Sequence, residues 1–307
     1  MTEPADLANT SCGFIALVGA PNAGKSTLLN SLVGTKVSIV THKAQTTRSQ
    51  VRGVVTLDAA QLVFIDTPGI FAPKRRLDRA MVDSAWGGAG DADIVAFIID
   101  ADRGITSDIE LLLEGLENIQ QPRVLIINKI DTVRHESLLE LSQTLNERLR
   151  FEATFMLSAL KGHGVKDFID WCIKHVPPGP WHFPEDHLTD LTMAITAAEV
   201  TREKLFLRVH DEIPYTSTVE TESFKIQKDG SYKIDQVVYL ARESHKKIVL
   251  GAGGQTIKSI GAEARKELME MYEVPIHLFL FVKVREKWAD DPERYQEMGL
   301  EFPANKK

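Results

Sequence analysis

Along the first half of the chain, short apolar runs rich in β-branched residues alternate with segments of helical periodicity. Such runs favour buried strands, and their alternation with helices is typical of βαβ units and a mostly parallel sheet. We therefore predict an α/β domain. The predicted strands are Phe14–Val18, Val51–Leu57, Leu62–Ile65, Ile94–Ile99, Val124–Ile127 and Thr154–Leu157, and the predicted helices are Lys25–Val33, Ser107–Leu116, Glu136–Leu149 and Val165–His175.

The alternation stops at residues 176–184, which read VPPGPWHFP. Four prolines and one glycine in this stretch neither continue a helix nor fit a central strand, so we place a domain boundary here. The patterns that follow have the order helix, strand, strand, helix, turn, helix, strand, which is typical of an α+β domain. They cover Leu191–Val209, Thr216–Gln227, Tyr232–Arg242, a short helix, a glycine-rich turn, Thr256–Tyr272 and Ile276–Val284.

These patterns divide the chain into segments. We expect an N-terminal extension at 1–10, an α/β domain at 11–176, a linker at 177–187, a smaller α+β domain at 188–290 and a C-terminal tail at 291–307. The tail is polar from Asp290 onward, and we expect it to be loosely held.

The composition, with 43% hydrophobic and 26% charged residues, is that of a folded globular protein. No apolar run approaches the roughly 18 residues that span a membrane, and Met1–Thr10 lacks the basic start of a signal peptide. Cys12 and Cys172 are far apart and have no metal-ligand spacing, which favours buried thiols in a reducing compartment. We therefore expect a cytoplasmic protein.

The formal net charge of −7 is spread over both halves of the chain, but one stretch is locally basic. Arg242–Lys266 contains six basic and two acidic residues. Such a cluster is either a solvated face or part of a nucleic-acid site, and charge alone does not decide between them.

The strongest chemical signal is GAPNAGKS at residues 19–26, which matches the pattern G-x-x-x-x-G-K-[ST] between a predicted strand and a predicted helix. Glycines let the backbone curl so that its N–H groups and the helix N-terminus face phosphate oxygens. Lys25 then neutralises the β- and γ-phosphates, and the Ser26 hydroxyl binds magnesium. The alternative is a tight strand–helix turn without a ligand. The predicted nucleotide contacts of this loop are Asn22, Ala23, Gly24, Lys25, Ser26 and Thr27.

A second element, DTPG at residues 66–69, ends the apolar run Leu62–Ile65. Sheets of this type bind ligands at the carboxyl ends of their strands. Asp66 is therefore placed to reach magnesium, generally through a water, and the Gly69 N–H is free to meet a γ-phosphate. A Pro-Gly turn capped by Asp66 is the alternative interpretation.

Two further elements predict a guanine site. Asn128, Lys129 and Asp131 belong to the sequence NKID at the end of a predicted strand. A carboxylate at Asp131 accepts hydrogen bonds from the ring N–H and the exocyclic amine of guanine together, a donor pair that adenine lacks. Ser158 and Ala159 follow another predicted strand, where a backbone N–H can contact the base oxygen.

All four elements, in this order, resemble the translation-factor class of P-loop GTPases. The resemblance implies an α/β GTPase domain with GTP and GDP as ligands and Mg²⁺ as cofactor. It also implies a threonine between the first helix and the second strand that ligates magnesium only when the γ-phosphate is present. Thr46 and Thr47 both lie there, and we select Thr47. The predicted magnesium ligands are thus Ser26, Thr47 and Asp66, and the predicted catalytic residues are Lys25, Thr47 and Gly69.

One departure from Ras-like enzymes concerns the residue after DTPG, which is Ile70 rather than the glutamine that orients the attacking water. Hydrolysis must then depend on magnesium, Lys25 and backbone dipoles, and we expect it to be slow. Asn22 resembles the asparagine with which potassium-stimulated relatives hold a K⁺ ion. A loop-capping role for Asn22 is the alternative.

In the second domain, residues 251–254 read GAGG between two helical patterns, inside the basic stretch. Together with the order of elements, this G-x-x-G turn resembles a prokaryotic, type II KH domain, which implies that single-stranded RNA binds there. Ala252 departs from the lysine that many such loops carry, so phosphate contacts shift to flanking lysines. The predicted RNA-binding residues are Lys246, Lys247, Gly251, Ala252, Gly253, Gly254, Lys258 and Arg265.

Almost the whole chain resembles a family of bacterial GTPases with a C-terminal KH domain. The resemblance implies a monomer that binds the 3′ end of 16S ribosomal RNA and assists assembly of the small (30S) ribosomal subunit. It also implies loose association with the cytoplasmic face of the inner membrane. The competing hypothesis is a membrane or protein-interaction switch whose second domain is a docking module.

Overall fold

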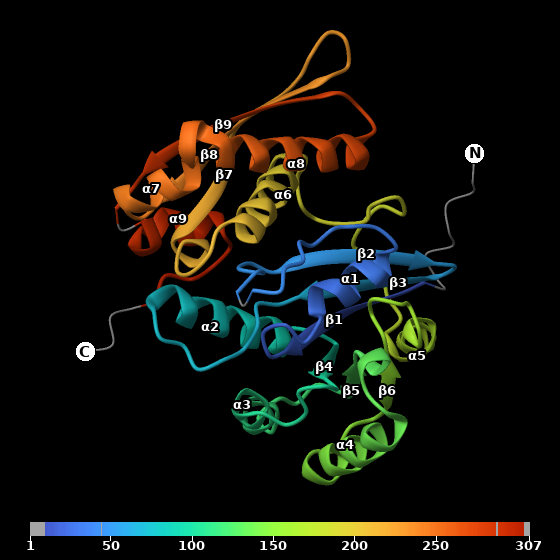
Figure 1. The fold of residues 1–307 in the computed structure, drawn as a ribbon. Coiled ribbons are helices and arrows are strands. Elements are labelled where there is room, and N and C mark those ends of the chain that lie inside the picture. Colours follow the sequence, from blue (N-terminus) through green and yellow to red (C-terminus); the bar gives the residue numbers. More distant parts are fainter. Residues whose placement is uncertain (1–9, 44, 287, 304–307) are drawn as a thin grey trace. The chain divides into compact units, whose positions relative to one another are not determined.

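The computed structural model describes residues 10–43, 45–286 and 288–303, which form two compact units (Figure 1). Of the described residues, the first unit takes in those up to Ser38, Thr47–Asp190 and those from Met298 onward. The second unit takes in Ile39–Thr46 and Leu191–Glu297. Most of the predicted N-terminal extension, 1–9, and the end of the predicted tail, 304–307, lie outside the described residues.

A six-stranded sheet forms the centre of the first unit. Its strands, in the order β2-β3-β1-β4-β5-β6, are parallel except for β2, which pairs antiparallel with β3. The predicted α/β class is confirmed. The bounds are Ser11–Gly19 for β1, Val51–Leu57 for β2, Ala60–Asp66 for β3, Ile94–Asp100 for β4, Arg123–Asn128 for β5 and Thr154–Leu157 for β6.

Helices cover both faces of this sheet (Figure 1). α1 (Lys25–Val33) and α5 (Val165–His175) pack on one face. α2 (Arg76–Gly90), α3 (Ser107–Leu116) and α4 (His135–Arg148) contribute apolar side chains to the core on the other face. Because β3, β4 and most of β5 are buried on both faces, their near-continuous apolar runs follow from the fold.

Helix α2 has no counterpart among the predicted helices. Its second half carries Gly87, Gly88 and Gly90, each of which lowers helix propensity by about 1 kcal/mol relative to alanine. Packing compensates, because Met81, Ala85 and Ala89 are fully buried. Tertiary contacts thus decide the structure of this segment against its local propensity.

The expected linker is packed against the first unit over much of its length. The Cys12 N–H donates to Pro177 O at 3.1 Å, and the Phe183 N–H donates to Gln61 Oε1 at 2.9 Å. Leu188 O accepts the Val54 N–H at 2.9 Å, so this residue belongs with the first unit. The main stretch of the second unit therefore begins at Leu191 rather than at the predicted position 188.

The second unit contains a three-stranded sheet in the order β7-β8-β9. β7 (Ser217–Ile226) and β8 (Tyr232–Leu240) form an antiparallel hairpin, and β9 (Ile276–Val284) runs parallel to β8. Helices α6 (Met193–Arg208) and α8 (Gln255–Tyr272) pack on the sheet and on each other. The short helix α7 (Glu243–Leu250) precedes the glycine turn.

The expectation of a loosely held tail is wrong for its first residues. Pro292–Glu297 form helix α9, and the Tyr295 side chain is fully buried. Arg294 pairs with Glu220 and lies 5.1 Å from the centre of the Tyr239 ring. Leu300 is also buried. Isolated apolar side chains in an otherwise polar sequence hold this segment in place. They form no periodic pattern from which the helix could be predicted.

Candidate functional site

The loop between β1 and α1 is shaped by its glycines. Gly24 has φ +97°, a conformation that side chains other than glycine rarely adopt. A Cβ atom at Gly24 would lie 2.2 Å from Asn128 Nδ2, so the loop also needs glycine for close approach. Ala23 is buried, and Thr27 lies in the first turn of α1. Asn22 has φ +65°, which asparagine tolerates and which fits either of its predicted roles.

Lys25 is buried within this loop. Its ammonium donates to Gly19 O and to Ala20 O, each at 3.0 Å. Burial disfavours the charged form and lowers the pKa of Lys25 to about 8, while the nearby Asp66 carboxylate opposes this shift. The Lys25 ammonium is thus partly removed from water. Its attraction to a phosphate charge is therefore screened less than it would be at the protein surface.

Asp66 collects the predicted magnesium ligands at the end of β3. Its Oδ2 accepts from Ser26 at 2.6 Å, from Ser38 at 2.9 Å and from Thr47 at 3.2 Å, and the Ser26 and Thr47 oxygens are 2.9 Å apart. Burial raises the pKa of Asp66, against the lowering effect of Lys25 and these hydrogen bonds. Oδ1 is buried without a partner among the described residues. The hydroxyl oxygens of Ser26 and Thr47 and the carboxylate of Asp66 thus lie close together, and Oδ1 of Asp66 is available for a further contact. Such a set of oxygen ligands fits a hydrated Mg²⁺ ion.

The structure separates the two candidate threonines. The Thr46 hydroxyl donates to Lys43 O at 2.8 Å and pairs with Thr41, whereas only Thr47 reaches Asp66. Gly69 lies against the phosphate loop, since a Cβ atom there would come within 2.9 Å of the Pro21 backbone. Ile70 is fully buried in the core, where it has no access to an attacking water.

Asn128 joins the loops that follow three different strands. Its Nδ2 donates to Ala23 O at 2.9 Å, and its Oδ1 accepts the Ala159 N–H at 3.0 Å. Lys129 pairs with Asp100 at 2.6 Å, at the end of β4. A hydrogen bond from the Ser158 hydroxyl is the main cause that lowers the pKa of the exposed Asp131, so this carboxyl is charged at neutral pH.

The structure adds two residues that the sequence analysis did not single out. Ser38 binds Asp66, but no motif marks this serine, because it lies in the irregular segment between α1 and β2. Asp100 pairs with Lys129 and stands beside Asn128 in the β4–β5 register. Its position at a strand end was a usable signal, since the other predicted site residues have that position too.

The glycine turn of the second unit has an open outer side. Gly251, Gly253 and Gly254 have φ values of +72°, +57° and +76°. A Cβ atom at Gly253 or Gly254 would meet nothing within 4 Å, whereas one at Gly251 would lie 2.2 Å from Thr256 Oγ1. The turn therefore packs tightly on its inner side and exposes its backbone, together with Ala252, on the other.

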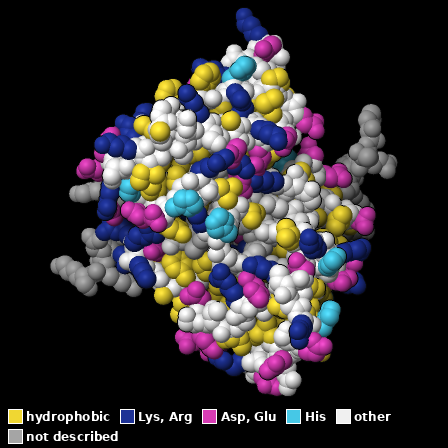
Figure 2. All heavy atoms as spheres, viewed as in Figure 1, with side chains coloured by type: hydrophobic (Ala, Val, Ile, Leu, Met, Phe, Trp, Pro, Cys, Tyr) yellow, Lys and Arg dark blue, Asp and Glu magenta, His cyan; other side chains and the backbone are white. Residues whose placement is uncertain are grey.

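Basic and apolar side chains flank this turn. Lys247, Lys258 and Arg265 are exposed, and Lys246 is half-buried 3.6 Å from Glu243. Ile248 is 55% exposed and offers an apolar contact for a base. Figure 2 shows Lys and Arg interspersed with Asp and Glu over the face in view, rather than one continuous basic field.

No helix in the described part of the chain is both long and apolar enough to span a membrane. Both cysteines are buried free thiols, as expected.

Both units of the chain match known protein families. Residues 14–129 match the family described as 50S ribosome-binding GTPase, and residues 212–289 match the KH domain family. GTPase Era of Mesorhizobium japonicum is 60% identical over 301 residues, which are 98% of this chain and 97% of that protein.

Two solved structures are similar over nearly the whole chain. Era in complex with MgGDPNP and nucleotides 1506–1542 of 16S ribosomal RNA is 36% identical with a TM-score of 0.90, covering 95% of this chain and 99% of that one. A variant of Aquifex aeolicus Era bound to GDP.AlF4⁻ is 36% identical with a TM-score of 0.89, covering 94% and 99%. The predicted GTPase activity and KH domain are confirmed.

Proposed function

Because this chain belongs to the GTPase Era family, we propose that it couples GTP hydrolysis to the binding of 16S ribosomal RNA during assembly of the small ribosomal subunit. The observation that carries the proposal is the presence, on one chain, of a strand-end site suited to guanine nucleotides and an exposed glycine turn flanked by lysines. The solved Era structure that holds both MgGDPNP and 16S ribosomal RNA supports this combination.

In the nucleotide site, we assign phosphate binding to the loop of residues 22–27 and to Lys25. Ser26, Thr47 and Asp66 would hold Mg²⁺, which neutralises charge on the phosphates when it is bound. We assign the Gly69 N–H to a hydrogen bond with the γ-phosphate. Asp131, oriented by Ser158, recognises the guanine donors, while Asn128, Lys129 and the Ala159 N–H shape the rest of the base pocket.

Hydrolysis in this site proceeds without a side chain that orients the attacking water from position 70. Ile70 is packed in the core, so the charge that develops at the β–γ bridge must be stabilised by Lys25, backbone N–H groups and bound cations. We assign a K⁺ ion at Asn22 to part of this task. The assignment rests on the resemblance of Asn22 to the asparagine of potassium-stimulated relatives, and the left-handed backbone at Asn22 is compatible with it.

We assign RNA binding to the turn at residues 251–254 and its flanking cations. A single strand can bring its phosphates against the exposed backbone at Gly253 and the N-terminus of α8, with Lys246, Lys247, Lys258 and Arg265 supplying positive charge. Ile248 provides apolar contact for a base. The RNA that supports this assignment is the 16S segment bound by the related Era protein.

The remaining functional predictions follow from the family resemblance alone. These are the action of the protein in the cytoplasm as a monomer and its loose association with the inner membrane. The alternative of a docking module in place of an RNA reader predicts a second domain that binds protein or lipid and has no affinity for 16S RNA.

A substitution at Gly253 tests the RNA assignment. Gly253→Asp puts a carboxylate on the open side of the turn, where it repels an approaching phosphate. Affinity for an oligonucleotide from the 16S 3′ end should fall by about tenfold or more, at unchanged GTP affinity. Gly253→Asn is the matched control, because it has the same shape and the same backbone demand without the charge. Equal RNA affinity of the Asp and Asn variants would contradict the assignment.

A further inference from the structure

The segment Ile39–Thr46 begins and ends beside one carboxylate. Ser38, just before it, donates to Asp66 Oδ2 at 2.9 Å, and Thr47, just after it, donates to the same oxygen at 3.2 Å. The segment itself is folded with the second unit. Thr47 is therefore the residue at which the chain returns to the first unit, after a segment that is folded with the second unit.

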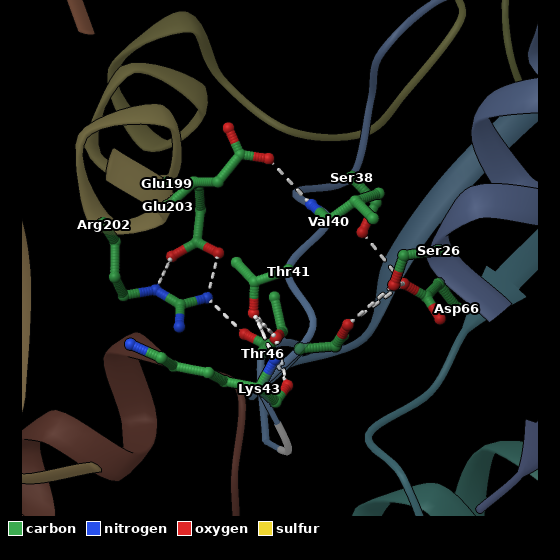
Figure 3. Close-up of polar contacts among 11 residues, drawn as sticks. Ser26, Ser38, Val40, Thr41, Lys43, Thr46, Asp66, Glu199, Arg202 and Glu203 are labelled. Carbon is green, nitrogen blue, oxygen red and sulfur yellow. Dashed lines mark hydrogen bonds and ion pairs between the residues drawn. The ribbon is translucent and has the colours of Figure 1, made fainter. Parts of the chain in front are cut away.

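Helix α6 holds this segment near both of its ends. Glu203 accepts the Val40 N–H at 2.9 Å, and the Arg202 guanidinium donates to Thr46 O at 2.6 Å (Figure 3). The Thr46 carbonyl belongs to the planar peptide group that contains the Thr47 nitrogen. The Arg202 contact therefore fixes the direction in which the backbone enters Thr47.

Lys43 anchors the middle of the segment at the C-terminal end of α6. Its ammonium donates to Phe206 O and Val209 O, where backbone acceptors lack partners within the helix and the helix dipole favours a positive charge. Lys43 O in turn accepts the Thr46 hydroxyl at 2.8 Å. A shift of the chain at Lys43 is thus transmitted to Thr46.

The side chains on α6 are themselves fixed. Arg202 is 2% exposed and Glu203 is 3% exposed, and buried charges are tolerated when they are paired. Arg202 Nε binds Glu199 Oε1 at 2.7 Å, and Glu203 pairs with Lys204 at 2.8 Å. Locked side chains on a helix position a contact more accurately than groups on a loop.

We propose that Arg202, Glu203 and Lys43 are positioning residues for GTP hydrolysis, which hold the segment Ile39–Thr46 so that the Thr47 hydroxyl meets Mg²⁺ beside the γ-phosphate. The inference rests on the role proposed above for Thr47. It gives helix α6, in the unit that carries the KH domain, a task in the reaction of the other unit.

The test compares full-length variants in steady-state GTP hydrolysis and in GDP binding. Lys43→Met removes the donors and keeps the aliphatic stem, so kcat should fall by about ten- to hundredfold through misplacement of Thr47. GDP affinity should not change, because GDP has no γ-phosphate. Lys43→Arg retains the donors and should restore most of kcat. Lys228→Met removes the same charge from an exposed turn of the second unit and should leave kcat unchanged.

Each outcome bears on one claim. Normal kcat in Lys43→Met, with slow hydrolysis in Thr47→Ala, overturns the positioning role while the role of Thr47 stands. Equal losses of GDP and GTP affinity at unchanged kcat would show that the contacts only stabilise the fold. Normal hydrolysis in Thr47→Ala would instead contradict the magnesium site itself. Arg202→Met, checked for folding by its melting temperature, should lower kcat as Lys43→Met does.

Discussion

At the scale of single residues, we expect Asp131 to determine the choice of base. It is exposed, it carries a carboxylate whose pKa is lowered by the Ser158 hydroxyl, and it follows strand β5 at the predicted base site. Asp131→Asn should shift preference from guanine to xanthine nucleotides, because an amide N–H can donate to the oxygen that replaces the guanine amine. Competition between GTP and XTP measures the shift, and an unchanged GTP preference would remove Asp131 from the base pocket.

We expect Lys25 to give nucleotide affinity a defined pH dependence. Burial lowers its pKa to about 8 in the nucleotide-free site, and bound phosphates favour the charged form, so binding takes up a proton once the pH exceeds 8. The contribution of Lys25 to GTP affinity should be constant below pH 7 and fall as pH rises through 8, which amounts to a loss of about tenfold at pH 9. Titration calorimetry of the wild type and of Lys25→Met separates this effect from ionisation of the nucleotide, because the variant retains only the latter. Identical pH profiles would contradict the prediction.

The role of Asn22 is decided by the choice of monovalent cation. If it holds K⁺ at the β–γ bridge, hydrolysis should be faster in potassium than in sodium salts at equal ionic strength. Asn22→Gly should abolish the difference, and glycine tolerates the φ of +65° at this position without strain. A loop-capping asparagine predicts equal rates in both salts.

The predictable residues are those that follow a strand in a recognisable motif. Lys25, Asp66, Asn128 and Asp131 were located because a phosphate loop and strand-end polar groups have few other uses in an α/β sheet. Ser38 was not, because its contact with Asp66 depends on the path of an irregular segment that leaves no periodic trace.

At the scale of elements, the local sequence pattern was sufficient to predict a helix or strand wherever burial and intrinsic propensity favour the same structure. The doubly buried strands β4 and β5 are continuous apolar runs, and the predicted bounds differ from the observed ones by a residue or so. Helix α2 was missed because Gly87, Gly88 and Gly90 oppose the helix that Met81 and Ala85 stabilise by packing. Helix α9 was missed because its tertiary contacts come from two neighbouring side chains, the paired Arg294 and the buried Tyr295, which form no periodic pattern.

At the scale of the whole molecule, the sequence predicted two domains. It did not predict that a segment within the first domain's stretch of sequence folds with the second unit. Ile39–Thr46 lies between α1 and β2 in the sequence, so chain order assigns it to the first domain, whereas its contacts belong to the second. The tertiary contacts of this segment with α6 reveal the assignment: Lys43 binds the end of the helix, Arg202 binds Thr46 O and Glu203 binds the Val40 N–H. The segment supplies a covalent route by which nucleotide state can affect the KH-bearing unit.

That route predicts a coupling between GTP and RNA. The γ-phosphate should order Thr47, and Thr47 is covalently joined to a segment held by α6. RNA should therefore bind with different affinity in the GTP-analogue and GDP states, and couplings of about 1–3 kcal/mol are typical. By linkage, RNA must change the affinity for the GTP analogue, relative to GDP, by the same factor. Measuring both factors by fluorescence anisotropy, in the wild type and in Thr47→Ala, provides the check. The two factors should agree in the wild type and approach one in the variant, and identical RNA affinities in both nucleotide states of the wild type would rule the coupling out.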